Sequence, residues 1–137
     1  MIQSAEEFVR LRLSQDRAEY LRAAHESASD EVWLEVINNY PEMREWVAHN
    51  KTTPRTILEF LSNDSDPKVR HTVSSRRSAG EDILNKLAFD SSELVRLSVA
   101  RNPKVTEKIL LKLLDDELDY LVEVAKEKLK KIKQSIN

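Results

Sequence analysis

The sequence predicts an all-α protein, a short right-handed α-solenoid of about four to five helix pairs, each stacked on its neighbours. Three observations predict this fold. Apolar residues recur at helical spacings along the chain. The pattern itself repeats with a constant period of about 26 residues. The chain has 137 residues but only one glycine, Gly80, whereas β-hairpins need glycine at their turns.

The repeat is clearest in six columns of three identical residues. Chance would give on the order of a tenth of one such column, so the repeat is real. The columns are Ile57, Ile83 and Ile109; Leu58, Leu84 and Leu110; Leu61, Leu87 and Leu113; Asp64, Asp90 and Asp116; Val47, Val73 and Val99; and Arg44, Arg70 and Arg96. A further column is apolar throughout and contains Met43, Val69, Val95 and Leu121.

Each repeat is expected to form two short helices, because its apolar residues lie three or four positions apart. A helix of nine or ten residues is only marginally stable alone, so its apolar stripe must be buried on the neighbouring pair. We expect helices near residues 4–13, 16–26, 30–39, 41–50, 54–63, 67–76, 80–89, 92–101, 106–115 and 118–134.

Polar residues and prolines predict where several helices begin and end. Thr53 and Asp66 each precede a proline, as an N-cap residue does. Ser4 with Glu7, and Ser78 with Glu81, have the spacing of a capping box. Two residues are expected to end helices in the left-handed conformation that asparagine tolerates, Asn50 and Asn102.

The chain is expected to be a single domain over residues 1–137 with three regions. Residues 1–40 form an irregular N-terminal cap and a degenerate repeat, in which WLEVI matches the later ILEFL at an offset of 24. Residues 41–116 hold the regular repeats, and residues 117–137 form a capping helix. The apolar stripe of that helix is Leu118, Leu121, Val122, Ala125, Leu129 and Ile132, with lysines on the other side.

Composition excludes several kinds of site. The chain has no cysteine, which removes disulfides, zinc fingers and thiol catalysis. One glycine is too few for a glycine-rich phosphate loop. The first residues do not resemble a signal peptide, and no apolar run is long enough to cross a membrane. We therefore expect a cytoplasmic protein that uses no membrane, cofactor or metal and is not an enzyme.

Two stretches carry a resemblance to a known family, WVAHNKTTPRTILEFLSNDSDPKVRHTV and VRLSVARNPKVTEKILLKLLDD. They resemble HEAT-like repeats, most closely the leucine-rich repeat variant, whose units stack as an armadillo-type superhelix. The resemblance is close over residues 41–116 and fainter over 20–40. It implies a fold and little about activity. An iron–sulfur cluster found in one such variant protein needs cysteines, which this chain lacks.

The aspartate and arginine columns have two interpretations. Three arginines in register suit a phosphate- or carboxylate-binding array, but a residue present in every repeat more often serves stacking. Each carboxylate can cap the following helix, and each arginine can reach the aspartate of a neighbouring repeat; HEAT-like repeats use these residues in that way. The predicted structural ladder is Arg44, Asp64, Arg70, Asp90, Arg96 and Asp116.

Residues that differ between repeats are the candidates for binding. In HEAT-like stacks the second helices line the concave face, so side chains there border a preformed surface. The basic ones are Lys68, Arg76, Arg77, Arg101 and Lys104. The predicted partner-binding residues are Trp46, His49, His71, Ser75, Arg76, Arg77 and Arg101.

Two of the histidines, His25 and His49, occupy matching positions in adjacent repeats, but no third residue at metal-ligand spacing accompanies them. Trp33 takes a column of buried isoleucines and is expected in the core. Trp46 falls in a column with less interior room and is expected to be partly exposed.

The predicted function is a non-enzymatic protein–protein interaction module, acting as a monomer or weak dimer through the concave face. We expect an acidic partner where it meets residues 68–104. Residues 1–66 carry 7 basic and 13 acidic side chains, and residues 67–137 carry 15 and 11. The resemblance leaves two alternatives: a bacterial immunity protein that neutralises a cognate toxin, and a nucleic-acid binder similar to helical-repeat DNA glycosylases. A net charge of −2 and the lack of aromatic residues near the basic ones disfavour nucleic acid.

Overall fold

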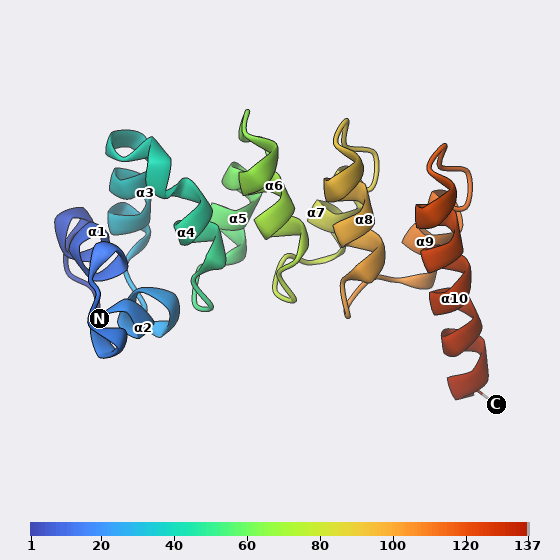
Figure 1. Ribbon diagram of the computed structural model, residues 1–137, viewed down its shortest axis with the longest axis horizontal. Coiled ribbons are helices and arrows are strands. Elements are labelled where there is room, and N and C mark those ends of the chain that lie inside the picture. Colours follow the sequence, from blue (N-terminus) through green and yellow to red (C-terminus); the bar gives the residue numbers. More distant parts are fainter. Residues whose placement is uncertain (137) are drawn as a thin grey trace. The chain divides into compact units, whose positions relative to one another are not determined.

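The computed structural model describes residues 1–136 and is all-helical. That part of the chain forms ten α-helices and one 3₁₀ turn, with no β-strand. One isolated bridge joins Ile2 and Ala28. The helices fall into two compact units, Met1–Val73 and Ser74–Asn137. Figure 1 shows the helices in chain order, and each unit is described by itself below.

The first unit packs its helices around a core centred on two aromatic rings. Phe8 and Trp33 meet edge to face, with ring centroids 5.2 Å apart and an interplanar angle of 86°. Trp33 is fully buried, as predicted from its column. The elements are α1 (Ala5–Leu13), α2 (Arg17–His25), α3 (Asp30–Asn39), the 3₁₀ turn η1 (Pro41–Met43), α4 (Arg44–His49), α5 (Arg55–Leu61) and α6 (Pro67–Ser74), whose last residue belongs to the second unit.

The second unit consists of four further helices: α7 (Glu81–Leu87), α8 (Glu93–Arg101), α9 (Glu107–Leu113) and α10 (Asp119–Ile136). The long helix α10 packs against α8 and α9. Its predicted apolar stripe faces them: Leu121 and Ala125 are fully buried, and the other members of the stripe are half-buried. The lysines Lys126, Lys130, Lys131 and Lys133 are exposed.

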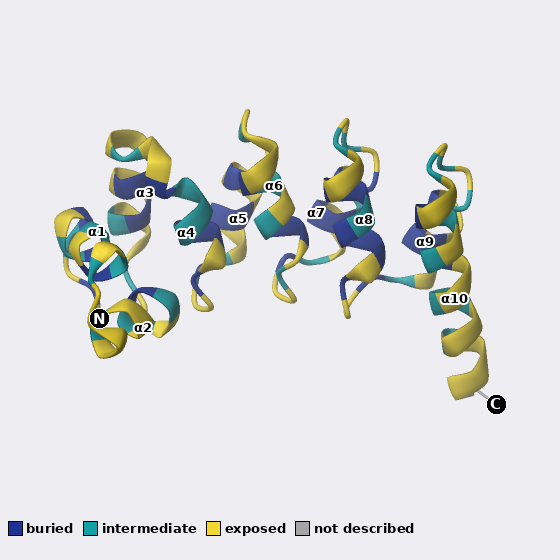
Figure 2. Ribbon diagram, viewed as in Figure 1, coloured by how far each residue is buried: buried dark blue, intermediate teal, exposed yellow. Residues whose placement is uncertain are grey.

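Every residue of the repeated apolar columns is buried, from Met43 at 6% exposure to Leu110 at 0%. Figure 2 shows buried residues, in dark blue, on the short helices α5, α7 and α9. Burying a leucine, isoleucine or valine side chain contributes roughly 1.5–3 kcal/mol, which offsets the poor stability of an isolated seven-residue helix. The apolar positions that recur along the sequence are thus the positions that the fold buries.

Two of the predicted N-terminal caps are confirmed and two are wrong. Asp66 accepts from the Lys68 amide at 2.9 Å, and Ser4 accepts from the Glu7 amide at 3.1 Å. Thr53 does not cap α5; its hydroxyl donates to the Val47 carbonyl at 2.7 Å. Ser78 does not cap α7 either. That helix begins at Glu81 directly after Gly80, whose φ of 88° is the left-handed conformation that glycine permits.

Asn50 and Asn102 follow the last residues of α4 and α8, as predicted, but the predicted left-handed conformation is wrong. Both have extended backbones, with φ and ψ of −60° and 130° for Asn50 and −62° and 128° for Asn102. Their buried side-chain amides bind other segments instead. The Asn50 amide donates to Ala23 and Glu26 carbonyls at 2.7 and 3.0 Å. The amide of Asn102 donates in the same way to two carbonyls of its own unit, at 2.8 and 3.0 Å.

The arginine column makes one contact in common, to the backbone of an earlier segment. Arg70 donates to the Asp64 carbonyl at 2.7 Å and Arg96 to the Asp90 carbonyl at 2.9 Å. Arg44 donates to the Ile37 carbonyl at 2.8 Å. These bonds fix each guanidinium beside the turn or helix that precedes its own helix.

Arg44 and Arg96 each also pair with the aspartate 20 residues later in the chain. Arg44 lies 3.1 Å from Asp64, and Arg96 lies 2.8 Å from Asp116. Burial alone would raise the pKa of the Asp116 carboxyl. Hydrogen bonds from Arg96 and from the Leu118 amide outweigh burial and hold that pKa below its ordinary value. A role of these pairs in stability, rather than in ligand binding, stays a prediction.

Candidate functional site

The predicted binding residues are divided between the two units. In the first unit, Trp46 is half-buried on α4 and His49 is exposed at its end, while His71 is exposed on α6. The second unit holds Ser75, Arg76, Arg77 and Arg101; of these only Arg76 is half-buried, and burial lowers its pKa. Trp46 and His49 lie together on one pocket, and that pocket is the candidate site.

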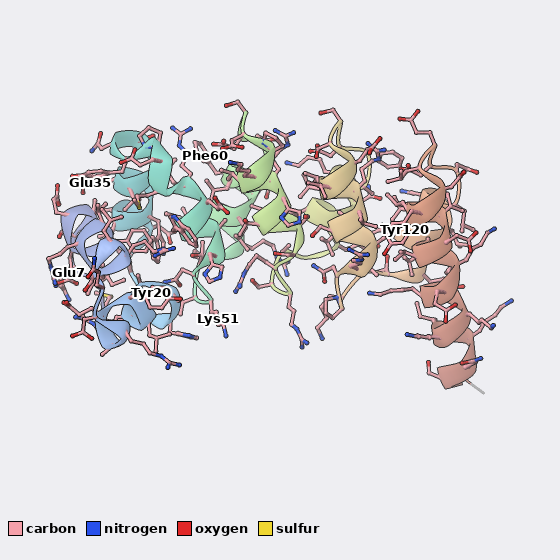
Figure 3. The ribbon with its side chains drawn as sticks, viewed as in Figure 1. Glu7, Tyr20, Glu35, Lys51, Phe60 and Tyr120 are labelled. Atoms are coloured by element: carbon pink, nitrogen blue, oxygen red, sulfur yellow. The ribbon has the colours of Figure 1, made fainter. Side chains whose placement is uncertain are left out.

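The pocket is a hollow of about 350 Å³ in the first unit, formed by α1, α2, α4 and the turn after α4. Figure 3 labels Tyr20 on α2 and Lys51 just after α4, two of its lining residues. The full lining is Arg12, Tyr20, Leu21, Ala23, Ala24, His25, Trp46, His49 and Lys51.

Polar contacts between the helices hold the walls of this pocket in place. Glu19 near the start of α2 binds Arg10 and Ser14 at the end of α1, and these hydrogen bonds lower the pKa of Glu19. The other wall is fixed by Asn50, whose amide binds the end of α2, and by the Lys51 amide, which donates to the Ala24 carbonyl at 2.9 Å. The pocket is therefore built into the packing of the unit.

Aromatic rings and a guanidinium are stacked inside the pocket. The Arg12 Cζ atom lies 3.5 Å from the centroid of the Trp46 ring and 5.4 Å from that of Tyr20. Trp46 also meets His49 edge to face, with centroids 5.7 Å apart and an interplanar angle of 72°. A cation over an aromatic face is worth about 0.5–2 kcal/mol, so this contact helps to hold Arg12 over the indole.

Two cationic side chains of the pocket, Arg12 and Lys51, have no anionic partner within the described residues 1–136. No aspartate or glutamate is among its lining residues. Over residues 1–136, the side chains of Arg12, His25 and Lys51 form no hydrogen bond or ion pair. Residues 1–73 carry 9 basic and 13 acidic side chains, so this pocket is cationic within an acidic unit. Its chemistry suits an anionic group that carries apolar surface beside it.

No family model, curated protein or solved structure matches this chain. The HEAT-like assignment therefore rests on the sequence pattern, and the pocket is interpreted from its own residues.

Other features of the chain offer less to a ligand. A second hollow of about 350 Å³ surrounds Arg96 and Asp116, where the charges are paired, and its Lys112 donates to Asn85 at 2.8 Å. Arg101, a predicted binding residue, places its guanidinium 5.3 Å from the Tyr120 ring and donates to the phenol oxygen. A partner of the second unit would meet this stacked pair rather than an extended arginine.

The two histidines of the matching column are the pair that could begin a metal site. His25 and His49 line the same pocket, but residues 1–136 contain no group of three His, Cys, Asp or Glu side chains placed to hold a metal ion. Within the same described range, each helix is either too short or too polar to span a bilayer.

Of the nine lining residues, the sequence predicted only Trp46 and His49 for binding, and it gave no sign of Arg12, Tyr20 or Lys51. Arg12 and Tyr20 lie in the irregular N-terminal region, where no repeat column marks a position as variable. The available signal was the matching column of His25 and His49, which correctly placed α2 and α4 side by side.

Proposed function

We propose that this chain is a non-enzymatic protein-binding module whose helix pairs stack as a HEAT-like, right-handed α-solenoid of the leucine-rich-repeat-variant kind. The support is repetition at three levels. The apolar columns recur at a constant period and are buried. Arginine–aspartate pairs 20 residues apart occur in both units, and so do the amide-to-carbonyl links of Asn50 and Asn102. Repeated links of this kind are what stacked pairs need.

The proposed binding surface lies on the second helix of each pair, and the pocket belongs to it because α2 and α4 are the second helices of the first two pairs. The single observation that carries this proposal is Trp46, half-buried in a pocket beside Arg12 and Lys51, whose side chains have no anionic partner within the described chain. Tryptophan and arginine dominate the energy of protein interfaces, especially in preformed pockets.

The test is capture of the partner by wild-type protein and by two matched variants. Trp46→Ala removes the pocket aromatic, while Phe60→Ala removes a ring that is 53% exposed on α5 of the same unit. We expect one protein to bind wild type and Phe60→Ala stoichiometrically. We expect it to bind Trp46→Ala at least about 30-fold more weakly, as loss of an interface hot spot predicts.

Affinities are to be measured with the purified partner by calorimetry, and circular dichroism verifies that each variant folds. The proposal is wrong if Trp46→Ala binds the purified partner as tightly as wild type does, or if no stoichiometric complex forms with wild type.

A further inference from the structure

We propose that the pocket of the first unit receives a carboxylate side chain from a short acidic segment of a partner protein, with an aliphatic neighbour of that carboxylate resting on the aromatic rings. This inference rests on the proposed protein-binding function and adds to it the chemistry of the bound segment.

Arg12 is the residue that the geometry assigns to the carboxylate. Its Cζ atom lies over the Trp46 ring, 3.5 Å from the centroid, so the indole holds the guanidinium in place through a contact that uses none of its N–H groups as donors to an oxygen. None of those N–H groups has an acceptor in the described chain. A planar guanidinium held in one orientation binds a carboxylate through two parallel hydrogen bonds and loses little side-chain entropy on doing so.

Two acidic residues near the pocket, Glu19 and Glu26, bind groups outside its lining. Glu19 binds Arg10 and Ser14. Glu26, which follows α2, binds Arg22 through both carboxylate oxygens, at 2.6 and 3.1 Å. Hydrogen bonds from Arg22 and from the N-terminal amino group, which lies 2.9 Å away, lower the pKa of Glu26 to about 2, so its charge is shared between these two groups. Lys51 and His25 therefore remain at the pocket as additional donors for an anion.

The size and floor of the pocket favour a short peptide segment. A hollow of about 350 Å³ is at the small end of ligand sites and holds one or two side chains. Leu21, Ala23 and Ala24 add apolar surface beside the rings of Tyr20 and Trp46. An aliphatic side chain next to the carboxylate fits this surface.

The charge of the surrounding unit argues against nucleic acid as the ligand. Residues 1–73 carry four more acidic than basic side chains, so a long polyanion would be repelled around the pocket. A segment with one or two carboxylates avoids that repulsion and still satisfies Arg12.

The test is a titration of the full chain followed through the indole N–H resonance of Trp46. The probe is the blocked peptide acetyl-Glu-Leu-Glu-Leu-amide, and its matched control is acetyl-Gln-Leu-Gln-Leu-amide. We expect a saturable shift of the Trp46 resonance with the acidic peptide and at least about tenfold weaker binding of the neutral one. Inorganic phosphate and a short oligothymidylate are titrated in parallel, and both are expected to bind more weakly than the acidic peptide.

Two variants locate the contact. Arg12→Gln should weaken the acidic peptide at least about tenfold, whereas Arg17→Gln, an exposed arginine of α2 outside the pocket lining, should leave binding unchanged. If Arg12→Gln does not fold, the proposal is still tested by comparing the acidic and the neutral peptide on wild-type protein. Equal binding of the neutral peptide, or tighter binding of phosphate or oligothymidylate, overturns the proposal, as does full binding by a folded Arg12→Gln.

These outcomes separate the ligand assignment from the proposed function. Suppose that the partner binds wild type but not Trp46→Ala, and that the acidic peptide does not shift the Trp46 resonance. The carboxylate assignment is then rejected, and the proposed function stands. Suppose instead that the acidic peptide gives a saturable shift of the Trp46 resonance, but that Trp46→Ala binds the partner as tightly as wild type does. The proposed function is then rejected, and the carboxylate-binding site stands.

Discussion

Arg96 and Asp116 form a pair in which both side chains are largely withdrawn from solvent, with exposures of 10% and 8%. The corresponding pair of the first unit is more open, because the Arg44 side chain is 30% exposed while that of Asp64 is 8% exposed. Removing one member of a buried pair leaves the other charge without compensation, and water relieves this penalty only where it can reach the remaining group. The same substitution should therefore cost more in the second unit than in the first.

We predict that Asp116→Ala lowers the free energy of unfolding by roughly 2–3 kcal/mol, and that Asp64→Ala lowers it by about 1 kcal/mol. Asp116→Asn should fall between Asp116→Ala and wild type, because an asparagine oxygen still accepts from the Leu118 amide, which lies 2.9 Å from the carboxylate. Urea denaturation followed by circular dichroism gives the three values. A loss smaller than about 0.5 kcal/mol for Asp116→Ala, the low end for one hydrogen bond, would contradict the structural interpretation of the ladder.

At the scale of the helix, the two asparagines show how one element is tied to another. The Asn102 side chain is nearly buried at 2% exposure and uses both ends of its amide. Its nitrogen donates to the Ser74 carbonyl at the end of α6 and to the Arg76 carbonyl. Its oxygen accepts from the Lys104 amide at 2.8 Å and closes the turn after α8. Asn50 repeats this arrangement in the first unit.

We predict that Asn102→Ala destabilises the chain by roughly 2–3 kcal/mol, because it removes the buried hydrogen bonds from the Asn102 amide to the Ser74 and Arg76 carbonyls and opens the turn. Asn102→Asp separates these two effects, since an aspartate keeps the acceptor for the Lys104 amide but has no amide hydrogens to donate. Hydrogen exchange measured by NMR should show faster opening around Ser74 and Arg76 in both variants. Unchanged exchange there would mean that the link contributes nothing to holding this segment in place.

The helices themselves were predictable from the sequence, but their ends were less so. Apolar spacing located every helix, because burial in this chain follows the helical period. The capping patterns were wrong at Thr53 and Ser78. The Thr53 hydroxyl donates to the Val47 carbonyl instead of capping α5, and Gly80 rather than Ser78 directly precedes α7. Asn50 and Asn102 ended helices as expected, yet for a reason that depends on carbonyls 27 and 28 residues away.

At the scale of the molecule, the core was predictable from the sequence and the pocket was not. The core follows from columns that any repeat comparison finds, and each of their apolar residues is buried. The pocket combines Arg12 of α1 with Trp46 of α4 and Lys51 beyond it, three residues that share no column. Their proximity depends on how α1, α2 and α4 pack, and no local pattern encodes that packing. Only the paired histidines, His25 and His49, gave a partial signal.

The proposed stacking of the helix pairs makes a prediction about the chain in solution. A compact globule of 137 residues has a radius of gyration of about 14 Å. Packed helices lie about 8–10 Å apart, so five stacked pairs would extend over roughly 40–50 Å and raise the radius of gyration to about 17 Å.

Small-angle X-ray scattering distinguishes these two values, provided that light scattering on the same sample gives the mass of a monomer, 15.9 kDa. A dimer would also raise the radius of gyration, so the mass measurement is the necessary control. A monomer with the radius of gyration of a compact globule would reject the solenoid, because the pairs would then have to fold back on one another instead of stacking in a row. The extended value would leave the second helices available along one continuous surface, which is what binding through that surface requires.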